Sequence, residues 1–439
     1  MYLTGRLPLL VATGVVPVIL LSVAGVHAWL AALGWLVLCT LAAGADALAA
    51  ADPRSLDIVR TLPRRVRLGE PVEATLSVHN PSTRRVRGRA RDAWQPTAGA
   101  PDARIVLDVP AGERRRITVP LLPRRRGELR SEFVVVRSDG PMRLAGRQAS
   151  LSAPGAIRVL PPFASRRHLP SRLARLRELD GNTSVQVRGQ GTEFDSLREY
   201  VRGDDVRSID WRATARSGTT MLRTWRPERD RHVVIVIDTG RTAAARVGDS
   251  IRLDAAMEAA LLLAALATRA GDHVHLVMFD RVVRARVTGI DGAALLPALV
   301  DAMAPVEAQL IDTDWDAAIA QVRALSTRPS LVVLLTAQDA PEAARGLLGS
   351  LPALTSRAHV LVGAATDSVL GAGAVLDEPV RATAEDVYRA AAVERTRRDA
   401  DLVAAAIVRA GGEALADTPD ALPPRIADRY LSLKAAGRL

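Results

Sequence analysis

An apolar run from Leu7 to Ala51 constrains the fold of this chain more than any other part of its sequence. One helix needs about 20 residues to cross a bilayer, so the run is too long for a single crossing. Two crossings fit it, near Leu7–Val23 and Ala28–Leu48, joined by a tight turn. A cleaved signal peptide is the alternative, but it leaves the second apolar segment unexplained. We therefore expect two transmembrane helices over residues 1–51.

Arginines flank this apolar pair on both sides. Arg6 precedes the first segment, and a cluster of arginines follows the second: Arg54, Arg60, Arg64, Arg65 and Arg67. Positive charge is retained on the cytoplasmic side of membrane proteins. The sequence therefore predicts a cell-membrane protein with two spans and both termini in the cytoplasm.

The chain has 439 residues and a net charge of +11, and most of this charge falls between Arg60 and Arg130. Such a basic region can bind nucleic acid or an anionic membrane face. Its place after the membrane segment favours the anionic lipids of the inner leaflet. Trp94 is its only aromatic residue, so it lacks platforms for stacking single strands, and we expect no nucleic acid partner. The single cysteine, Cys39, excludes an intramolecular disulfide and a Cys-based zinc site.

Residues 52–160 have the pattern of a β domain. The stretch from Pro71 to Pro81 alternates apolar and polar residues with the period of a strand. Similar short runs recur between turn residues, at Ile105–Val109, Ile117–Leu122, Leu129–Val136 and Ile157–Leu160. This spacing predicts an all-β sandwich of immunoglobulin-like shape, serving as a spacer or docking module.

Residues 232–439 alternate apolar strands with helices of ten or more residues. The clearest strands are His232–Ile237, Val274–Phe279 and Leu331–Thr336, and long helices cover Leu253–Ala270 and Ala384–Ala410. This order predicts an α/β domain with a mainly parallel, doubly wound sheet. The whole chain is thus expected to be multidomain.

Between these two domains, residues 161–231 hold a segment dense in both charge and aromatic side chains. Acidic residues alternate with arginines, and Phe194, Tyr200, Trp211 and Trp225 gather there although the chain is only 3% aromatic. Mixed charges with large aromatics indicate an ordered, ion-paired segment rather than a disordered tail. We expect this segment to pack on the α/β domain. Structural ion pairing is favoured over an acid/base pair, because each carboxylate has an arginine nearby.

The segment closely resembles the signature of the bacterial family called domain of unknown function fifty-eight. The matching positions are Gly191, Glu193, Phe194, Leu197, Arg198, Tyr200, Gly203, Asp204, Asp205, Arg207, Ile209, Asp210, Trp211, Ala215 and Arg216. The chain end, Tyr430–Lys434, is similar to the ending of that family. The resemblance implies a von Willebrand A-like domain over residues 232–439. It also implies a MoxR-type AAA+ ATPase as partner, in complex assembly or envelope and stress maintenance.

Polar residues follow several of the predicted strands. Asp238 ends the first strand, and Thr313 and Asp339 lie in loops expected at the same edge of the sheet. In open α/β sheets ligands bind beyond the carboxyl ends of the strands. One carboxylate, hydroxyls and water are suitable ligands for Mg²⁺. The bland alternative is that Asp238 and Thr242 only cap the following turn.

The resemblance places the von Willebrand A metal site on these loops. Asp238, Thr242 and Thr313 match the family pattern, whereas Gly240 and Ala337 replace two of its ligands. Asp339 is the candidate replacement for the third-loop carboxylate. We therefore expect a degenerate, weak Mg²⁺ site.

Three functions remain open on the sequence. The first is a membrane-anchored interaction or adaptor protein with a MoxR-type AAA+ partner. The second is a metal-dependent hydrolase that uses the acidic signature, although the sequence offers no nucleophile motif. The third is a basic nucleic-acid-binding membrane protein, which the apolar pair disfavours. We expect the first, and expect no enzymatic activity.

Overall fold

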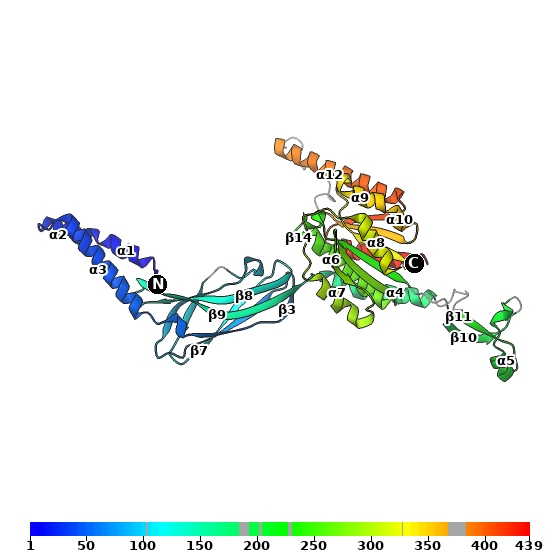
Figure 1. Cartoon of the computed structure of the whole chain (residues 1–439), viewed down its shortest axis with the longest axis horizontal. Coiled ribbons are helices and arrows are strands. Elements are labelled where there is room, and N and C mark those ends of the chain that lie inside the picture. The colour runs from blue at the N-terminus through cyan, green and yellow to red at the C-terminus, as the bar shows by residue number, and fades with distance from the viewer. Residues whose placement is uncertain (102–103, 184–192, 202–203, 227–230, 327, 368–382) are drawn as a thin grey trace. The chain divides into compact units, whose positions relative to one another are not determined.

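The computed structural model describes residues 1–101, 104–183, 193–201, 204–226, 231–326, 328–367 and 383–439. They form two compact units, Met1–Leu160 and Pro161–Leu439. The first unit combines a helical hairpin with β-sheets, and the second alternates strands with helices (Figure 1).

The hairpin consists of α1 (Arg6–Thr13), α2 (Val15–Val23) and α3 (Ala28–Ala49). Helices α1 and α2 meet at Gly14, where the indole of Trp35 lies so close that a Cβ would collide with it. Two stretches, Arg6–Val23 and Ala28–Ser55, are long and apolar enough to cross a membrane, with mean hydropathies of 2.0 and 1.8. Few of their residues are buried inside the protein, so the hairpin presents its apolar side chains outward.

Two sheets make up the rest of the first unit. The larger has the order β1-β9-β8-β5-β6, with β3 also pairing with β9, and the smaller has the order β2-β4-β7. Their strands are β1 (Tyr2–Leu3), β2 (Asp57–Thr61), β3 (Arg65–Arg67), β4 (Val72–His79), β5 (Val86–Asp92), β6 (Ile105–Val109), β7 (Arg114–Leu121), β8 (Gly127–Asp139) and β9 (Ala145–Leu160). Leu76 and Val119 of the smaller sheet share one core with Leu107 and Ile157 of the larger. The two sheets therefore form a β-sandwich, as the alternating sequence predicted.

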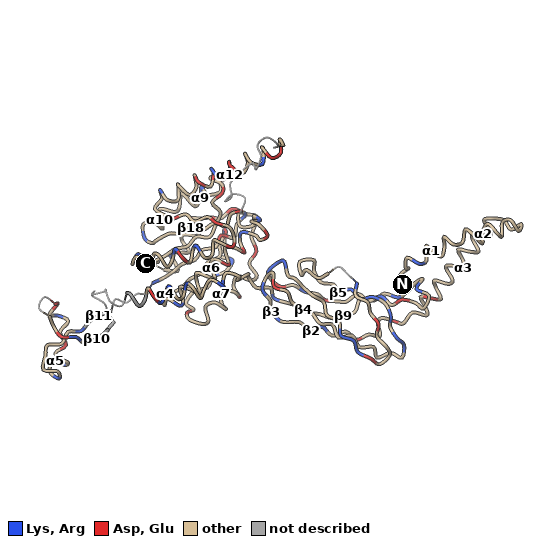
Figure 2. The backbone as a smooth tube through the Cα atoms, turned by 180° about the vertical axis from the view of Figure 1, so that it is seen from behind, with Lys and Arg blue, Asp and Glu red and all other residues tan. Residues whose placement is uncertain are grey.

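Arginines mark the strands of this sandwich along its length (Figure 2). Some of them are structural rather than available to a membrane. Arg60 is buried, donates to the carbonyl of Ser131 at 2.7 Å, pairs with Asp92 and lies 5.2 Å from the centre of the Trp94 ring. Burial lowers the pKa of Arg60, and Asp92 opposes that shift. Arg60 itself is therefore not available for the lipid contact predicted for the Arg60–Arg130 region.

The hairpin is fastened to the sandwich at its base. Asp46 in α3 accepts hydrogen bonds from the backbone N–H groups of Met142, Leu144 and Ala145, at 2.7, 2.7 and 3.0 Å. Strand β1 adds to the edge of β9, and Tyr2 donates from its hydroxyl to Asp139. Burial raises the pKa of the Tyr2 phenol, as does its bond to Asp139. Asp46 is therefore a buried polar contact near the end of α3.

The second unit is built on a six-stranded sheet of order β16-β15-β12-β17-β18-β19. Its strands are β12 (His232–Asp238), β15 (His273–Phe279), β16 (Val283–Val287), β17 (Leu331–Leu335), β18 (His359–Ala365) and β19 (Glu413–Asp417). Among the described strands of this sheet only β16, at one edge, pairs antiparallel. The sheet is therefore mainly parallel, as predicted, and buried strands such as β17 are continuously apolar because both faces are covered.

Helices cover both faces of this sheet. Helix α6 (Arg252–Arg269) packs against α4 (Leu169–Thr183), α7 (Leu295–Met303) and α13 (Leu422–Ala435). Helix α9 (Pro341–Ser350) packs against α8 (Trp315–Leu325), α10 (Pro352–Thr355) and α12 (Ala384–Arg409). The second group shares a core with Val234 and Val236 of β12. The alternation of strands and helices places the carboxyl ends of β12, β17 and β18 at one edge.

The charged and aromatic segment forms a hairpin of its own. Strand β10 (Glu193–Glu199) pairs antiparallel with β11 (Met221–Arg226), and α5 (Trp211–Ser217) lies between them in sequence. Asp205 caps a short turn at Val206–Ser208 by accepting from the N–H of Arg207. The segment is thus ordered where the structure describes it.

Candidate functional site

The edge formed by the carboxyl ends of β12 and β17 is hollowed by a pocket of about 440 Å³. Asp238 and Thr242 line it from the loop after β12, and Thr336 lines it from the end of β17. Thr313, from the loop before α8, lines it from another side. Parallel strands bring these loops together because their carboxyl ends share one edge.

Asp238 is the centre of this group. Its side chain is buried, and it accepts from the hydroxyls of Thr242 at 3.0 Å, Thr336 at 2.6 Å and Thr313 at 2.5 Å. The N–H of Gly240 adds a bond of 2.8 Å. Each hydroxyl that donates to Asp238 keeps its lone pairs, so oxygen acceptors from several loops face one point. The structure therefore brings together Asp238, Thr242 and Thr313, as the sequence predicted.

Gly240 is one of the two positions at which the sequence departs from the expected metal-site pattern. A Cβ at this position would collide with the hydroxyl of Thr313 and crowd the carbonyl of Ile311. A side chain at residue 240 and the Thr313 hydroxyl therefore compete for the same space. The glycine leaves room for the Thr313 hydroxyl to reach Asp238.

In the loop that follows β17, Thr336 rather than Asp339 reaches Asp238. The carboxylate of Asp339 pairs instead with Arg252, at 2.8 Å. Arg252 also donates to the carbonyls of Thr242 at 2.9 Å and Ala365 at 3.0 Å. This buried guanidinium thus links the chain segments at the carboxyl ends of β12, β17 and β18. Sequence reasoning missed both Thr336 and Arg252, although Thr336 is the first polar residue after a buried strand.

A second carboxylate stiffens the neighbouring loop. Asp280 follows β15 and accepts from the hydroxyl of Thr239 at 3.0 Å and from Arg284 at 2.6 Å. Burial opposes its ionisation, but the bonds from Arg284 and from the N–H groups of Arg281 and Val282 outweigh burial, so the pKa of Asp280 lies below its usual value. Asp280 is therefore held as a carboxylate that fixes the loop and is satisfied by its neighbours.

The donor set suits a hard cation better than a soft one. It offers one carboxylate and hydroxyl oxygens, which fit Mg²⁺ with retained waters. Among the described residues no group of three or more His, Cys, Asp or Glu side chains is arranged to hold a metal ion. Arg241 lines the same pocket and pairs with Asp312 at 2.7 Å, so a guanidinium also stands at the rim. A weak Mg²⁺ site in this pocket therefore stays a prediction.

The signature residues are tied into the local structure of the β10–β11 hairpin. Asp204 pairs with Arg198 at 2.7 Å and accepts from the N–H of Val201 at 3.0 Å. Tyr200 is half-buried, and its N–H bonds to the carbonyl of Thr220. These carboxylates and arginines stabilise the turn between the strands.

Asp210 caps helix α5. It accepts from the N–H groups of Arg212 and Ala213 and pairs with Arg223 at 2.7 Å. These bonds, the one from Ala213 first, lower the pKa of Asp210. The ion-pair partner of Asp210 is Arg223, across the hairpin.

Other signature positions lie outside this network. Trp211 is 71% exposed, and its packing on the α/β domain stays a prediction. Arg216 donates to the carbonyl of Arg212 within α5. Gly203 lies outside the described residues, and only the backbone of Glu193 and Phe194 is described.

Comparison with solved structures gives distant likenesses that each cover about a quarter of the chain. The ASH/PapD-like domain 7 of human CEP192 is 16% identical and covers 25% of this chain and 89% of its own, with a TM-score of 0.20. The CARDB domain of the PF1109 protein from Pyrococcus furiosus is 16% identical and covers 24% and 86%, with a TM-score of 0.19. A FixG-related protein from Vibrio parahaemolyticus is 10% identical and covers 25% and 98%, with a TM-score of 0.19. No curated protein matches the chain.

A protein family does match, over residues 196–399, under the description "Protein of unknown function DUF58". The match takes in most of the β10–β11 hairpin, the Asp238 pocket and much of α12. It agrees with the family that the signature residues resemble. The chain therefore contains a domain of the DUF58 family.

Proposed function

We propose that this chain is a membrane-anchored adaptor whose α/β domain binds a partner protein through the Asp238 pocket. The observation that carries the proposal is the convergence of hydroxyls from three loops on one buried carboxylate, in a pocket open to a partner. Such an arrangement is suited to binding at a strand-end crevice. It supplies oxygen ligands without a nucleophile placed beside a base.

The α/β domain is, in this proposal, a von Willebrand A-like module. Its strand order, with one antiparallel edge strand and parallel neighbours, supports that assignment. Asp238, Thr242, Thr313 and Thr336 would hold Mg²⁺, and the cation would present an electrophilic site to an acidic side chain of the partner. The weak donor set is the reason for expecting the partner's carboxylate to complete the shell.

We take the partner to be a MoxR-type AAA+ ATPase. This part of the proposal rests on the resemblance of the signature residues to the DUF58 family. The α1–α3 hairpin is proposed as the anchor, with both termini in the cytoplasm beside that ATPase. The outward-facing apolar side chains of the hairpin support a lipid environment. The pathway served is protein-complex assembly or envelope maintenance.

The two other candidate functions receive less support. Asp204, Asp205 and Asp210 of the acidic signature are each engaged in a turn, a cap or an ion pair, which favours a structural role over hydrolysis. In the sandwich Arg60 is buried, and Arg85 and Arg130 pair with acidic neighbours, which reduces the charge open to nucleic acid.

The test is capture of the partner by the full chain from crosslinked membranes, with Asp238→Asn compared with Asp312→Asn. Both carboxylates line the pocket, but Asp312 is exposed and paired with Arg241. We expect a AAA+ ATPase of the MoxR type to be captured by the wild type with Mg²⁺, and to be lost with chelator or with Asp238→Asn. Asp312→Asn should keep it. Capture that ignores both Asp238 and Mg²⁺ would overturn the proposed site.

A further inference from the structure

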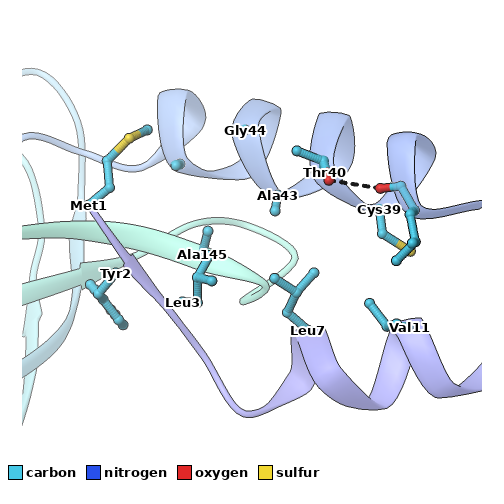
Figure 3. Close-up of a pocket in the computed structure, with 12 residues that line it drawn as sticks. Met1, Tyr2, Leu3, Leu7, Val11, Cys39, Thr40, Ala43, Gly44 and Ala145 are labelled. Atoms are coloured by element: carbon cyan, nitrogen blue, oxygen red, sulfur yellow. Dashed lines mark hydrogen bonds between the residues drawn. The ribbon is translucent and has the colours of Figure 1, made fainter. Parts of the chain in front are cut away.

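A second pocket, of about 310 Å³, lies at the base of the helical hairpin. Figure 3 shows Leu7 and Val11 of α1 facing Cys39 and Ala43 of α3 across it, with Leu3 of β1 at its end. The volume is at the lower end of that of small-molecule sites. The pocket therefore has room for part of a ligand, and the hairpin itself supplies most of its walls.

The pocket exists because α3 carries small residues on this face. Ala43, Gly44 and Ala47 line it, and a Cβ at Gly44 would meet no atom within 4 Å. The hydroxyl of Thr40 donates to the carbonyl of Leu36 at 2.8 Å, so it is satisfied inside the helix. The walls are thus almost wholly apolar. An apolar cavity of this kind stays dry and takes apolar ligands.

The sandwich closes one end of the pocket. Strand β1 pairs with β9 there, and Ala145 of β9 joins the lining. The bonds from the N–H groups of Met142, Leu144 and Ala145 to Asp46 hold this closure against α3. The pocket therefore has the sandwich as one of its walls, which distinguishes it from the space between two helices in lipid.

Two arginines lie next to residues that line the pocket: Arg6 precedes Leu7, and Arg143 lies two residues before Ala145. The N–H of Arg6 donates to the hydroxyl of Thr4 at 3.3 Å, and that hydroxyl donates to the carbonyl of Arg143. Both arginine side chains are exposed. Arg143 has a φ of +56°, a conformation that is uncommon for residues other than glycine. An apolar crevice next to exposed positive charge matches the acyl chain and the phosphate of an anionic phospholipid.

We propose that the pocket at the hairpin base binds one acyl chain of an anionic phospholipid, with its phosphate at Arg6 and Arg143. The proposal rests on the hairpin being a membrane anchor. The bound lipid fills the space left by Gly44 between α1 and α3. It thereby links the hairpin and the sandwich, and it gives the protein a preference among lipids of the leaflet on the sandwich side.

The test uses the full chain, reconstituted in bilayers of equal phosphatidylglycerol and phosphatidylcholine, then released and analysed by native mass spectrometry. Gly44→Leu places a side chain in the pocket, and a Cβ there meets no atom within 4 Å. Gly34→Leu is its matched control, because Gly34 is also in α3, lines a different apolar pocket and has equally open space at its Cβ. We expect retained phosphatidylglycerol on the wild type and on Gly34→Leu, and its loss on Gly44→Leu.

The charged part is tested separately. Arg143→Asn keeps a residue that tolerates positive φ, and Arg116→Gln in β7 removes one charge from the smaller sheet. We expect Arg143→Asn to lower the preference for phosphatidylglycerol about fivefold, the contribution of one surface cation, and Arg116→Gln to leave it unchanged. Equal retention of both lipids by the wild type, or unchanged retention by Gly44→Leu, would refute the lipid site.

Membrane fractionation separates this failure from failure of the anchor. Each variant should remain in the membrane after alkaline carbonate washing. A wild type that washes off contradicts the anchor itself. A wild type that stays in the membrane yet retains no lipid at the pocket contradicts only the inference made here.

Discussion

Lys434, the only lysine of the chain, donates a hydrogen bond of 2.9 Å to the carboxylate of Asp272. Both side chains are nearly inaccessible, at 7% and 3% exposure. The hydroxyl of Tyr430 donates to the same carboxylate, and Leu431 and Leu433 are buried beside it. Tyr430 and Lys434 therefore connect α13 to the turn after α6, and their role is structural.

We expect Lys434→Met to destabilise the α/β domain strongly. Removing one partner leaves the Asp272 carboxylate buried without its cation, which typically costs about 3–5 kcal/mol. Hydrogen exchange of α6 and α13 peptides, measured on the full chain, reports the loss. Arg395→Met is the control: its pair with Asp399 is exposed, at 4.0 Å, and such pairs contribute at most about 1 kcal/mol. Equal effects of the two variants would show that the buried pair adds nothing special.

Thr336→Val should weaken Mg²⁺-dependent partner capture while leaving the fold intact. Valine keeps the shape of threonine but cannot donate to Asp238, so one oxygen of the pocket is lost. Thr268→Val is the matched control, because its hydroxyl donates to the carbonyl of Ala264 within α6. Calorimetry with Mg²⁺ and capture from membranes measure the change. If both variants bind alike, Thr336 has no place in the site.

Asp280 should make the stability of the α/β domain depend on acid pH. Its pKa is lowered in the folded state, so folded protein binds fewer protons than unfolded protein below about pH 4, where a free aspartate titrates. The stabilisation is fully present above that pH and is lost as the pH falls through the folded pKa. Asp280→Asn should lower the thermal midpoint at pH 7 and reduce its fall between pH 7 and pH 3. An unchanged fall would assign the acid sensitivity to other carboxylates.

Gly140→Ala should loosen the hairpin from the sandwich. A Cβ at residue 140 would collide with the carboxylate and carbonyl of Asp46, and overpacking of this kind typically costs about 1–3 kcal/mol. Gly5→Ala, where a Cβ meets no atom within 4 Å, is the control. Faster proteolysis between α3 and β2 in Gly140→Ala alone is the expected readout. Equal rates for both variants would mean that the Asp46 contact can shift without cost.

The proposed topology predicts that a reporter active only outside the cytoplasm, fused after Leu439, stays silent. The prediction rests on the arginines on both sides of the hairpin, Arg6 before it and Arg54 after it. A fusion in the turn at residues 24–27 is the positive control, because that turn should face the other side. Activity at Leu439 would reverse the orientation and remove the cytosolic partner.

Periodicity predicted most of the strands and helices, because both faces of the central sheet are buried and its strands are continuously apolar. It missed β5, where the inward positions are Val86, Gly88 and Ala90 and the outward ones are arginines, so the apolar signal is weak. It also missed β19, an edge strand in which four of the five residues are Ala, Glu or Asp, which have low strand propensity. The helix α13 beyond it was likewise not predicted.

The site was predictable in part for a different reason. Asp238, Thr242 and Thr313 follow from the rule that strand ends gather at one edge. Thr336 and Arg252 depend on side-chain packing between loops far apart in sequence, which a linear pattern does not carry. Asp339 is paired with the guanidinium of Arg252, and it is Thr336 that contacts Asp238.

The bonds that hold Asp46 to the β8–β9 turn limit how far the sandwich can move relative to α3. A flexible tether allows a domain to sample a wide range of distances from its attachment point. Here α3 continues into the sandwich with its last turn fastened, since Arg147 also donates to the carbonyl of Ala47 at 3.1 Å. In a bilayer the sandwich would therefore stand at one height and one tilt. The surface of the sandwich would then lie at a defined distance from the lipid headgroups.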